Sequence, residues 1–121
     1  MSNKLTKDER LRSKISIDAL FKKGKGIIKY PIKMQYMSHD RPVHQVAFTA
    51  PKRNFKRAVD RNRIKRLMRE TYRTNKHILS EKDIPAQAIF FIYIGKEMPT
   101  YANLEKRMKG CLKELSQKVK K

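Results

Sequence analysis

The stretch from Arg57 to Arg73 constrains the fold more than any other part of the chain, because its apolar and cationic residues recur with helical spacing. The residues at the i, i+3 and i+4 positions of a core-facing helical stripe are Ile64, Leu67, Met68, Thr71 and Tyr72. The cations at every fourth position along one side of this stripe are Arg61, Lys65, Arg69 and Arg73. The pattern predicts a helix that buries one face and turns a dense cationic face outward.

This cationic face predicts binding to a polyanion. Seven of the seventeen residues are Lys or Arg, and only Asp60 and Glu70 oppose them. Like charges one helical turn apart repel each other, and the phosphates of a nucleic acid would relieve that repulsion. Six of the seven cations are arginine, whose guanidinium group binds phosphate through two parallel hydrogen bonds. An ordinary solvated helix mixes charges of both signs, so the pattern favours nucleic-acid binding.

Composition narrows the class of partner. The chain has 121 residues, with 31 Lys and Arg against 11 Asp and Glu, which gives a formal net charge of +20. A charge of this size on a small chain is typical of proteins that bind nucleic acid or an anionic membrane. No apolar run approaches the ~20 residues that span a bilayer, so no membrane partner is expected. Cys111 is the single cysteine, which excludes an internal disulfide and favours a reducing, cytoplasmic location.

The periodicity predicts one small α+β domain over residues 1–121, whose residues 1–12 form a flexible basic N-terminus. A short helix is expected from Ser16, its N-cap, to Gly24, which would take the left-handed position after the helix. Asn54 is a candidate N-cap for the basic helix, and Thr100 for a long C-terminal helix. The buried stripe expected on this last helix consists of Leu104, Met108, Cys111, Leu112, Leu115 and Val119.

Three segments predict β-structure. Residues 27–37 alternate with period two after Pro31, which indicates a half-buried strand. Residues 43–50 indicate a second strand, antiparallel to the first, and the apolar run at 88–94 indicates a central strand covered on both faces. Residues 77–85 are expected to form a polar connector. The order is helix, two or three strands, basic helix, strand and helix, with the helices packed on one sheet.

The basic stretch carries a motif that resembles the protein subunit of bacterial ribonuclease P. The family motif R-N-R-x-K-R-x-x-R stands here as Arg61-Asn62-Arg63-Ile64-Lys65-Arg66-Leu67-Met68-Arg69, complete at each defining position. The pair Lys52-Arg53 matches a strand of the family that ends in two basic residues, and Arg10-Leu11, Phe21 and Gly24 match its early pattern. The resemblance covers roughly residues 5–115 and is far more specific than a lone glycine motif.

The resemblance implies a ribonucleoprotein in which a large RNA removes the 5′ leader from precursor tRNA by hydrolysis. It also implies a fold like the second domain of ribosomal protein S5, with a left-handed βαβ crossover through the basic helix. The implied partners are ribonuclease P RNA and precursor tRNA, with no DNA, and Mg²⁺ is expected mainly on the RNA subunit. No catalytic residue and no metal ligand is expected on the polypeptide, because its carboxylates are scarce and dispersed.

Two sets of site residues are expected. The expected RNA-binding residues are Lys52, Arg53, Arg57, Arg61, Asn62, Arg63, Lys65, Arg66, Arg69 and Arg73. By the resemblance, the residues of a cleft that holds the leader strand are Ile17, Phe21, Gln35, Tyr36, Thr49 and Arg53. Gln35 and Tyr36 are neighbours, so they would point to opposite faces of a sheet, and the sequence leaves open which one faces the cleft. Phe21 is equally well interpreted as a core residue.

Two other classes of protein share this charge and size. A ribosomal protein or an RNA chaperone would bind RNA without belonging to an enzyme, and composition alone does not exclude either. A helix-turn-helix DNA-binding protein would need a compact helix before the basic helix, where a strand is expected instead. His39, Asp40 and His44 could be drawn together as metal ligands, but a polar loop is the favoured interpretation of that segment.

Overall fold

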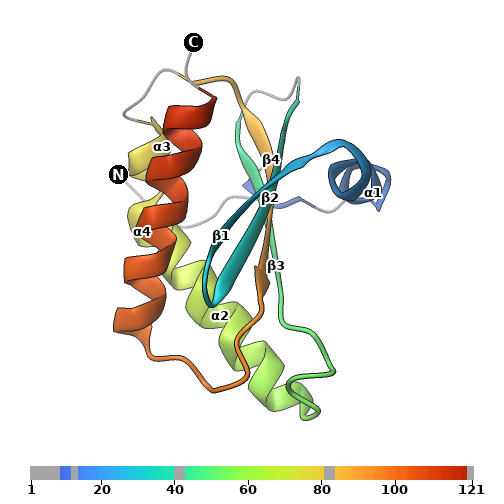
Figure 1. Cartoon of the computed structure of the whole chain (residues 1–121), viewed down its shortest axis with the longest axis vertical. Helices are drawn as coiled ribbons and strands as arrows, with labels where there is room; N and C mark the ends of the chain where they lie inside the picture. The colour runs from blue at the N-terminus through green and yellow to red at the C-terminus, as the bar shows by residue number, and fades with distance from the viewer. Residues whose placement is uncertain (1–8, 12–13, 40–42, 81–83, 120–121) are drawn as a thin grey trace.

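The computed structural model describes residues 9–11, 14–39, 43–80 and 84–119 (Figure 1). In chain order, its elements are α1 (Lys14–Lys23), β1 (Lys25–Lys29), β2 (Ile32–Ser38), β3 (Gln45–Thr49), α2 (Ala58–Asn75), α3 (His77–Ser80), β4 (Gln87–Tyr93) and α4 (Tyr101–Lys118). This order confirms the α+β prediction, and three strands precede the basic helix. The short helix α3 lies in the segment that the sequence predicted to be a polar connector. Among the described residues, no helix is long and apolar enough to cross a membrane.

The described strands form one mixed sheet in the order β1-β2-β4-β3. Neighbouring strands are antiparallel except β3 and β4, which run parallel and are joined through α2 as a βαβ unit. β2 and β3 run in opposite directions, as expected, but β4 lies between them. Figure 1 shows α2, α3 and α4 on one side of the sheet and α1 on the other.

Residues 27–37, where Pro31 indicated a break or an edge position and where one or two strands were left open, contain parts of two strands. The chain reverses at Tyr30 and Pro31, whose peptide bond is cis, and β1 pairs back onto β2 from Lys25↔Tyr36 to Lys29↔Ile32. The physical reason is Pro31, which lacks the N–H that a continuous strand would donate to its neighbour. The predicted alternation is confirmed within β2, where Ile32 and Met34 are fully buried on the side of α2 and α4.

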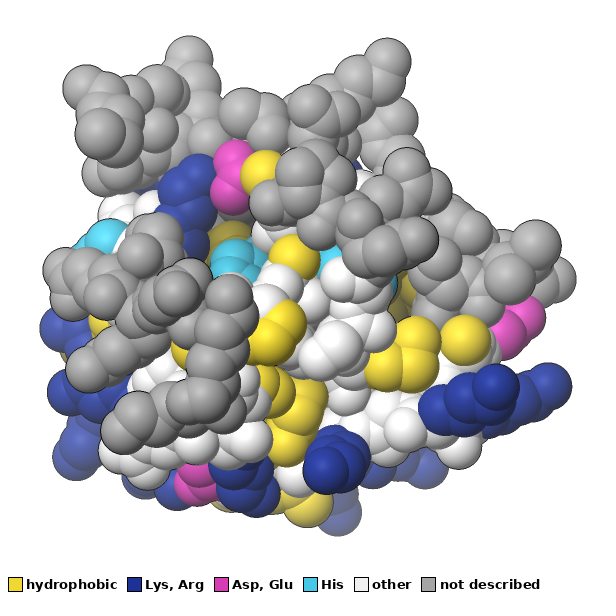
Figure 2. Space-filling model, turned by 90° about the horizontal axis from the view of Figure 1, so that it is seen from above, with side chains coloured by type: hydrophobic (Ala, Val, Ile, Leu, Met, Phe, Trp, Pro, Cys, Tyr) yellow, Lys and Arg dark blue, Asp and Glu magenta, His cyan; other side chains and the backbone are white. Residues whose placement is uncertain are grey.

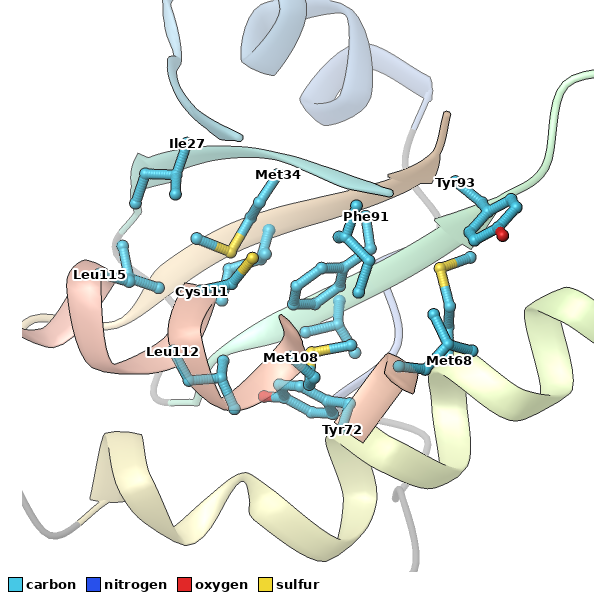
Figure 3. Packing of buried hydrophobic residues seen from close by; sticks show 14 of the residues in the cluster. Ile27, Met34, Met68, Tyr72, Phe91, Tyr93, Met108, Cys111, Leu112 and Leu115 are labelled. Atoms are coloured by element: carbon cyan, nitrogen blue, oxygen red, sulfur yellow. The ribbon is translucent and has the colours of Figure 1, made fainter. Parts of the chain in front are cut away.

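The main core lies between the sheet and the pair α2 and α4. Figure 3 shows Phe91 of the sheet facing Tyr72 of α2, and Met34 of the sheet beside Cys111 of α4. Phe91 on the central strand is fully buried and stacks on the ring of Phe48, with 5.4 Å between ring centroids. The predicted stripe of α2 is confirmed, except that Leu67 is only partly buried at the margin of the core.

The two faces of the sheet are covered unequally. The prediction that β4 is covered on both faces holds for Ala88, but Phe90 and Ile92 are only partly buried. A smaller cluster packs under α1 and consists of Leu11, Leu20 and Ala88 with Ile17, Met37, Ala47 and Phe90 around it. The short α1 therefore leaves part of this face accessible.

Several predicted helix ends differ from the structure. α1 begins at Lys14 rather than after Ser16. Gly24 has no left-handed backbone; a Cβ there would collide with the carbonyl oxygen of Leu20 and lie 3.0 Å from that of Tyr36. α2 begins after Arg57 with no side-chain cap, so the Asn54 prediction is wrong.

The C-terminal helix agrees closely with its prediction. Its N-cap is Thr100, whose Oγ1 accepts a hydrogen bond of 3.2 Å from the backbone N–H of Asn103. The predicted stripe is fully buried from Leu104 to Leu115, and Val119 is partly buried just beyond the helix. Cys111 is fully buried and is therefore a core residue, as expected, and this burial raises the pKa of its thiol to about 12.

Candidate nucleic-acid interface

The exposed residues of α2 lie mainly on its first half. We call this surface the basic face; it consists of Asn62, Arg63, Arg66 and Arg69 of α2 and of Arg57, the residue just before the helix. The loop that leads into α2 adds three more exposed cations, namely Lys52, Arg53 and Lys56. Burial of Ile64, Met68 and Tyr72 fixes the rotation of α2, so the basic face is held toward solvent by the core itself.

Arg61 holds the loop before α2 in place. Its Nη1 donates hydrogen bonds of 2.8 Å to the backbone carbonyl oxygens of Phe55 and Lys56. The ring of Phe55 is buried and lies 5.9 Å from that of Tyr93. The first arginine of the motif therefore anchors the loop and sets the position of Lys52 and Arg53, a role that the sequence did not assign to it.

The second half of α2 is less available to a ligand. Arg73 forms two hydrogen bonds with Glu70, the shorter at 2.7 Å, and this pairing lowers the pKa of Glu70 and raises that of Arg73. Lys65 is partly buried. Lys76, just past the helix, forms an ion pair of 2.9 Å with Glu9. The guanidinium of Arg69 lies 6.0 Å from the centre of the Phe48 ring and remains exposed. The four predicted ladder positions thus have different environments.

The second candidate surface lies on the face of the sheet beneath α1. Phe21 is 49% exposed, and its ring lies 5.2 Å from that of Phe90. Gln35 and Ala47 stand beside Phe90 in the register of the sheet, and the next row along the strands consists of Lys33, Ile92 and Thr49. The six strand residues of these two rows are partly buried. We call this strip of the sheet, together with Ile17 and Phe21 of α1, the cleft surface.

Gln35 and Tyr36 lie on opposite faces of the sheet. Tyr36 is only 4% exposed and packs in the main core, on the side of α2 and α4. Gln35 lies on the opposite face, with Phe90, because successive side chains of a strand alternate. Contrary to the expectation for Tyr36, it is Gln35 that lies on the cleft surface, and a role of Gln35 in leader binding stays a prediction. Thr49 ends β3, and Arg53 is exposed in the loop that follows.

Sequence reasoning missed four residues of the cleft surface, namely Lys33, Ala47, Phe90 and Ile92. Lys33 could have been found, because it stands two positions from Gln35 and so shares its face. Phe90 and Ile92 belong to an apolar run that resembles a strand buried on both faces, so nothing in their own pattern marked them as accessible.

The loop with Lys52 and Arg53 lies at one end of the sheet, and the histidines lie near the other end, where β3 begins. Figure 2 looks onto this end and shows histidine side chains among hydrophobic ones. His44 Nδ1 accepts a 3.0 Å hydrogen bond from the backbone N–H of Gln87, and burial lowers the pKa of this histidine. His39 Nε2 lies 2.9 Å from the carbonyl oxygen of Val43, and Asp40 lies outside the described residues. In the described ranges, no group of three His, Cys, Asp or Glu side chains could hold a metal ion.

A model of the ribonuclease P family matches residues 5–116. The chain belongs to the ribonuclease P protein family. Ribonuclease P protein components of similar sequence occur in Porphyromonas gingivalis (38% identity, 89% of this chain and 83% of the relative) and in Borreliella burgdorferi (37% identity, 84% of this chain and 85% of the relative). The sequence prediction of this family, made from the basic helix and its flanks, is confirmed.

Solved structures confirm the fold. The ribonuclease P protein of Thermotoga maritima superimposes with a TM-score of 0.75 at 22% identity, over 88% of this chain and 96% of that one. The Staphylococcus aureus protein gives a TM-score of 0.72 at 21% identity, over 93% and 98%. The chain is therefore the protein component of an endoribonuclease of tRNA processing, and ribonuclease P RNA is its implied partner. The helix-turn-helix alternative is wrong, since strand β3 precedes the basic helix.

Proposed function

We propose that this chain binds ribonuclease P RNA through the basic face and the 5′ leader of precursor tRNA through the cleft surface. The observation that carries the proposal is the separation of these surfaces, since α2 and α1 cover opposite sides of one sheet (Figure 1). A protein with two such sides can contact two polyanions at once. The RNA subunit, with its bound Mg²⁺, would perform the hydrolysis in the cytoplasm.

The basic face suits the phosphates of a structured RNA. Arg63 and Arg66 are exposed on a helix that the core holds rigid, so their guanidinium groups are presented without ordering a loop. Arginine pairs with phosphate through charge-assisted hydrogen bonds, and Asn62 adds a group that both donates and accepts. Such contacts position a protein on an RNA without reading its sequence.

The cleft surface suits an extended single strand. The half-exposed ring of Phe21 offers a face on which a base can stack, and stacking tolerates any base. Lys33 provides a cation in the row of the sheet next to that of Gln35 and Phe90, while Gln35 and Thr49 offer polar groups to sugar or base edges. The neighbouring Ile17 supplies an apolar contact rather than a stacking ring. A leader held here would distinguish precursor tRNA from mature tRNA, because only the precursor has a leader.

The two surfaces together explain how a protein could assist an RNA enzyme. RNA subunit and substrate repel each other, and a domain of net charge +20 placed between them reduces that repulsion. The protein should therefore lower the Mg²⁺ concentration that cleavage requires. In this proposal residues 1–121 act as one domain.

The leader contact gives a direct prediction. Phe21→Ala should weaken binding of the holoenzyme to precursor tRNA about 10-fold, since one base–ring contact contributes roughly 1–3 kcal/mol. Binding of leaderless tRNA should not change. The measurement is the Kd of the reconstituted holoenzyme for both substrates. Tyr101→Ala is the matched control, because Tyr101 is a similarly exposed ring on α4, on the other side of the sheet.

Two outcomes would contradict the leader proposal. One is an equal loss of affinity for leaderless tRNA, which would show a general defect. The other is an unchanged contribution of the wild-type protein to substrate affinity after the leader is truncated.

A further inference from the structure

A hollow of about 560 Å³ opens at the end of the sheet where β4 leaves it. Its walls are the β1–β2 turn with Tyr30, the loop of residues 95–100, and Asn103 and Arg107 on the first turns of α4. The volume falls within the roughly 300–1,000 Å³ of small-molecule binding sites. Neither the basic face nor the cleft surface includes these residues.

Close packing fixes the shape of this hollow. The hydroxyl of Tyr93 donates a 2.6 Å hydrogen bond to the carbonyl oxygen of Glu97, and the N–H of Ile94 donates one of 2.8 Å to that of Pro31. A side chain at Gly95 would not fit, because its Cβ would lie 2.7 Å from the Tyr93 hydroxyl and 2.8 Å from Pro31 Cβ. The loop and the turn are therefore held against each other before any ligand arrives.

The groups that line the hollow match the parts of a nucleotide. Tyr30 is 61% exposed and offers a ring on which a base can stack. Lys96 and Arg107 are exposed cations, and within the described part of the chain neither forms an ion pair. Glu97 adds a carboxylate that can accept a hydrogen bond from the exocyclic amino group of a base. A simple anion would use only the cations, and an acidic peptide would be repelled by Glu97.

The position of the hollow connects it to the RNA-binding loop. β3 and β4 are parallel, so the chain leaves both at the same end of the sheet. The loop after β3 carries the exposed Lys52, Arg53 and Lys56, and its Phe55 packs on Tyr93 of the hollow. An RNA bound to the basic face and this loop would have a strand within reach of the hollow.

We propose that this hollow binds one unpaired nucleotide of ribonuclease P RNA, with its base on Tyr30 and its phosphate on Lys96 and Arg107. This rests on the proposed function, which supplies the RNA. The nucleotide would be one that leaves the stacked helix, because a base must be unstacked to cover a protein ring.

The test measures, at fixed salt, the Kd of the protein for ribonuclease P RNA and the Kd of the reconstituted holoenzyme for precursor tRNA. Tyr30→Ala should weaken binding to ribonuclease P RNA roughly 10-fold, as expected for the loss of one base–ring contact. Tyr30→Phe should keep the affinity, and Tyr30→Leu should behave as the alanine variant does. Tyr101→Ala, an exposed ring that does not line the hollow, should bind as the wild type does. Urea unfolding checks that the variants fold equally, which the exposure of Tyr30 predicts.

Each possible result either supports or contradicts the proposed nucleotide site. If the wild-type protein and Tyr30→Ala bind the RNA equally tightly, the proposed nucleotide site is overturned and the proposed function is left intact. Absence of binding by the wild-type protein overturns the proposed function itself. A loss confined to precursor tRNA would assign the hollow to the substrate and overturn the assignment to ribonuclease P RNA. A loss with Tyr30→Leu but not with Tyr30→Phe supports stacking in the hollow.

Discussion

The Arg63→Ala/Arg66→Ala double variant should lose about 100-fold or more in affinity for ribonuclease P RNA, because each hydrogen bond to a charged group contributes roughly 1.5–3 kcal/mol. Both side chains are exposed on the basic face, and within the described residues neither forms a hydrogen bond or an ion pair. The double substitution should change the free energy of unfolding of the protein only slightly, because alanine is the best helix former. The slope of log affinity against log salt should also fall by about 1.4–1.8 for two lost phosphate contacts.

A matched control separates this interface from the effect of net charge. Lys106 and Lys109 are exposed on α4 with the same three-residue spacing, so Lys106→Ala/Lys109→Ala removes the same charge from another helix. This control should lose far less affinity. Equal losses in the two double variants would show that only net charge matters, and an unchanged affinity of Arg63→Ala/Arg66→Ala would remove the basic face from the proposal.

Phe91→Ala should lower the free energy of unfolding by about 3–5 kcal/mol, which is the usual cost of truncating a buried phenylalanine. Phe91 is fully buried on the central strand, and its ring contacts those of Phe48 and Tyr72 at 5.4 and 5.8 Å between centroids. Its removal leaves a cavity where the sheet meets α2 and α4 (Figure 3). Small domains are stable by only about 5–15 kcal/mol, so the loss is a large share of the total. Urea unfolding followed by circular dichroism measures it.

The neighbouring residue provides the control. Phe90 has the same side chain but points to the other face of the sheet, where it is only partly buried. Phe90→Ala should therefore cost less than about 2 kcal/mol, since less apolar area leaves water. Equal costs at the two positions would contradict the unequal burial of the two faces.

The two long helices could be predicted because each repeats its apolar stripe over many turns. A helix such as α4 has a stripe from Leu104 to Leu115 that only one rotation can bury. The β1–β2 hairpin was predicted only in part, because the period-two alternation starts after Pro31 and Ile27-Ile28 before it does not alternate. Pro31 was the available signal, since it interrupts the pattern and cannot donate to a continuous strand.

Roles within the two surfaces were harder to predict. Spacing shows that Arg61 lies on the cationic side of α2, but not that it turns back to the carbonyl oxygens of Phe55 and Lys56. The ion pair between Arg73 and Glu70 could have been predicted from the sequence, because the two residues are three positions apart on a helix. Tyr36 alternates with Ile32 and Met34, so the residues themselves favoured the core. The hollow beside Tyr30 was invisible, because it joins segments far apart in the chain.

The most direct test of the central claim is cleavage of precursor tRNA at low Mg²⁺ by a reconstituted enzyme. The protein is mixed with a bacterial ribonuclease P RNA, and release of the 5′ leader is compared with that by the RNA alone and by the protein alone. We predict cleavage only when both are present, because the cations of the protein replace part of the Mg²⁺ that the RNA needs. Cleavage by the protein alone, or no gain over the RNA alone, would contradict the claim that this chain assists an RNA-catalysed reaction.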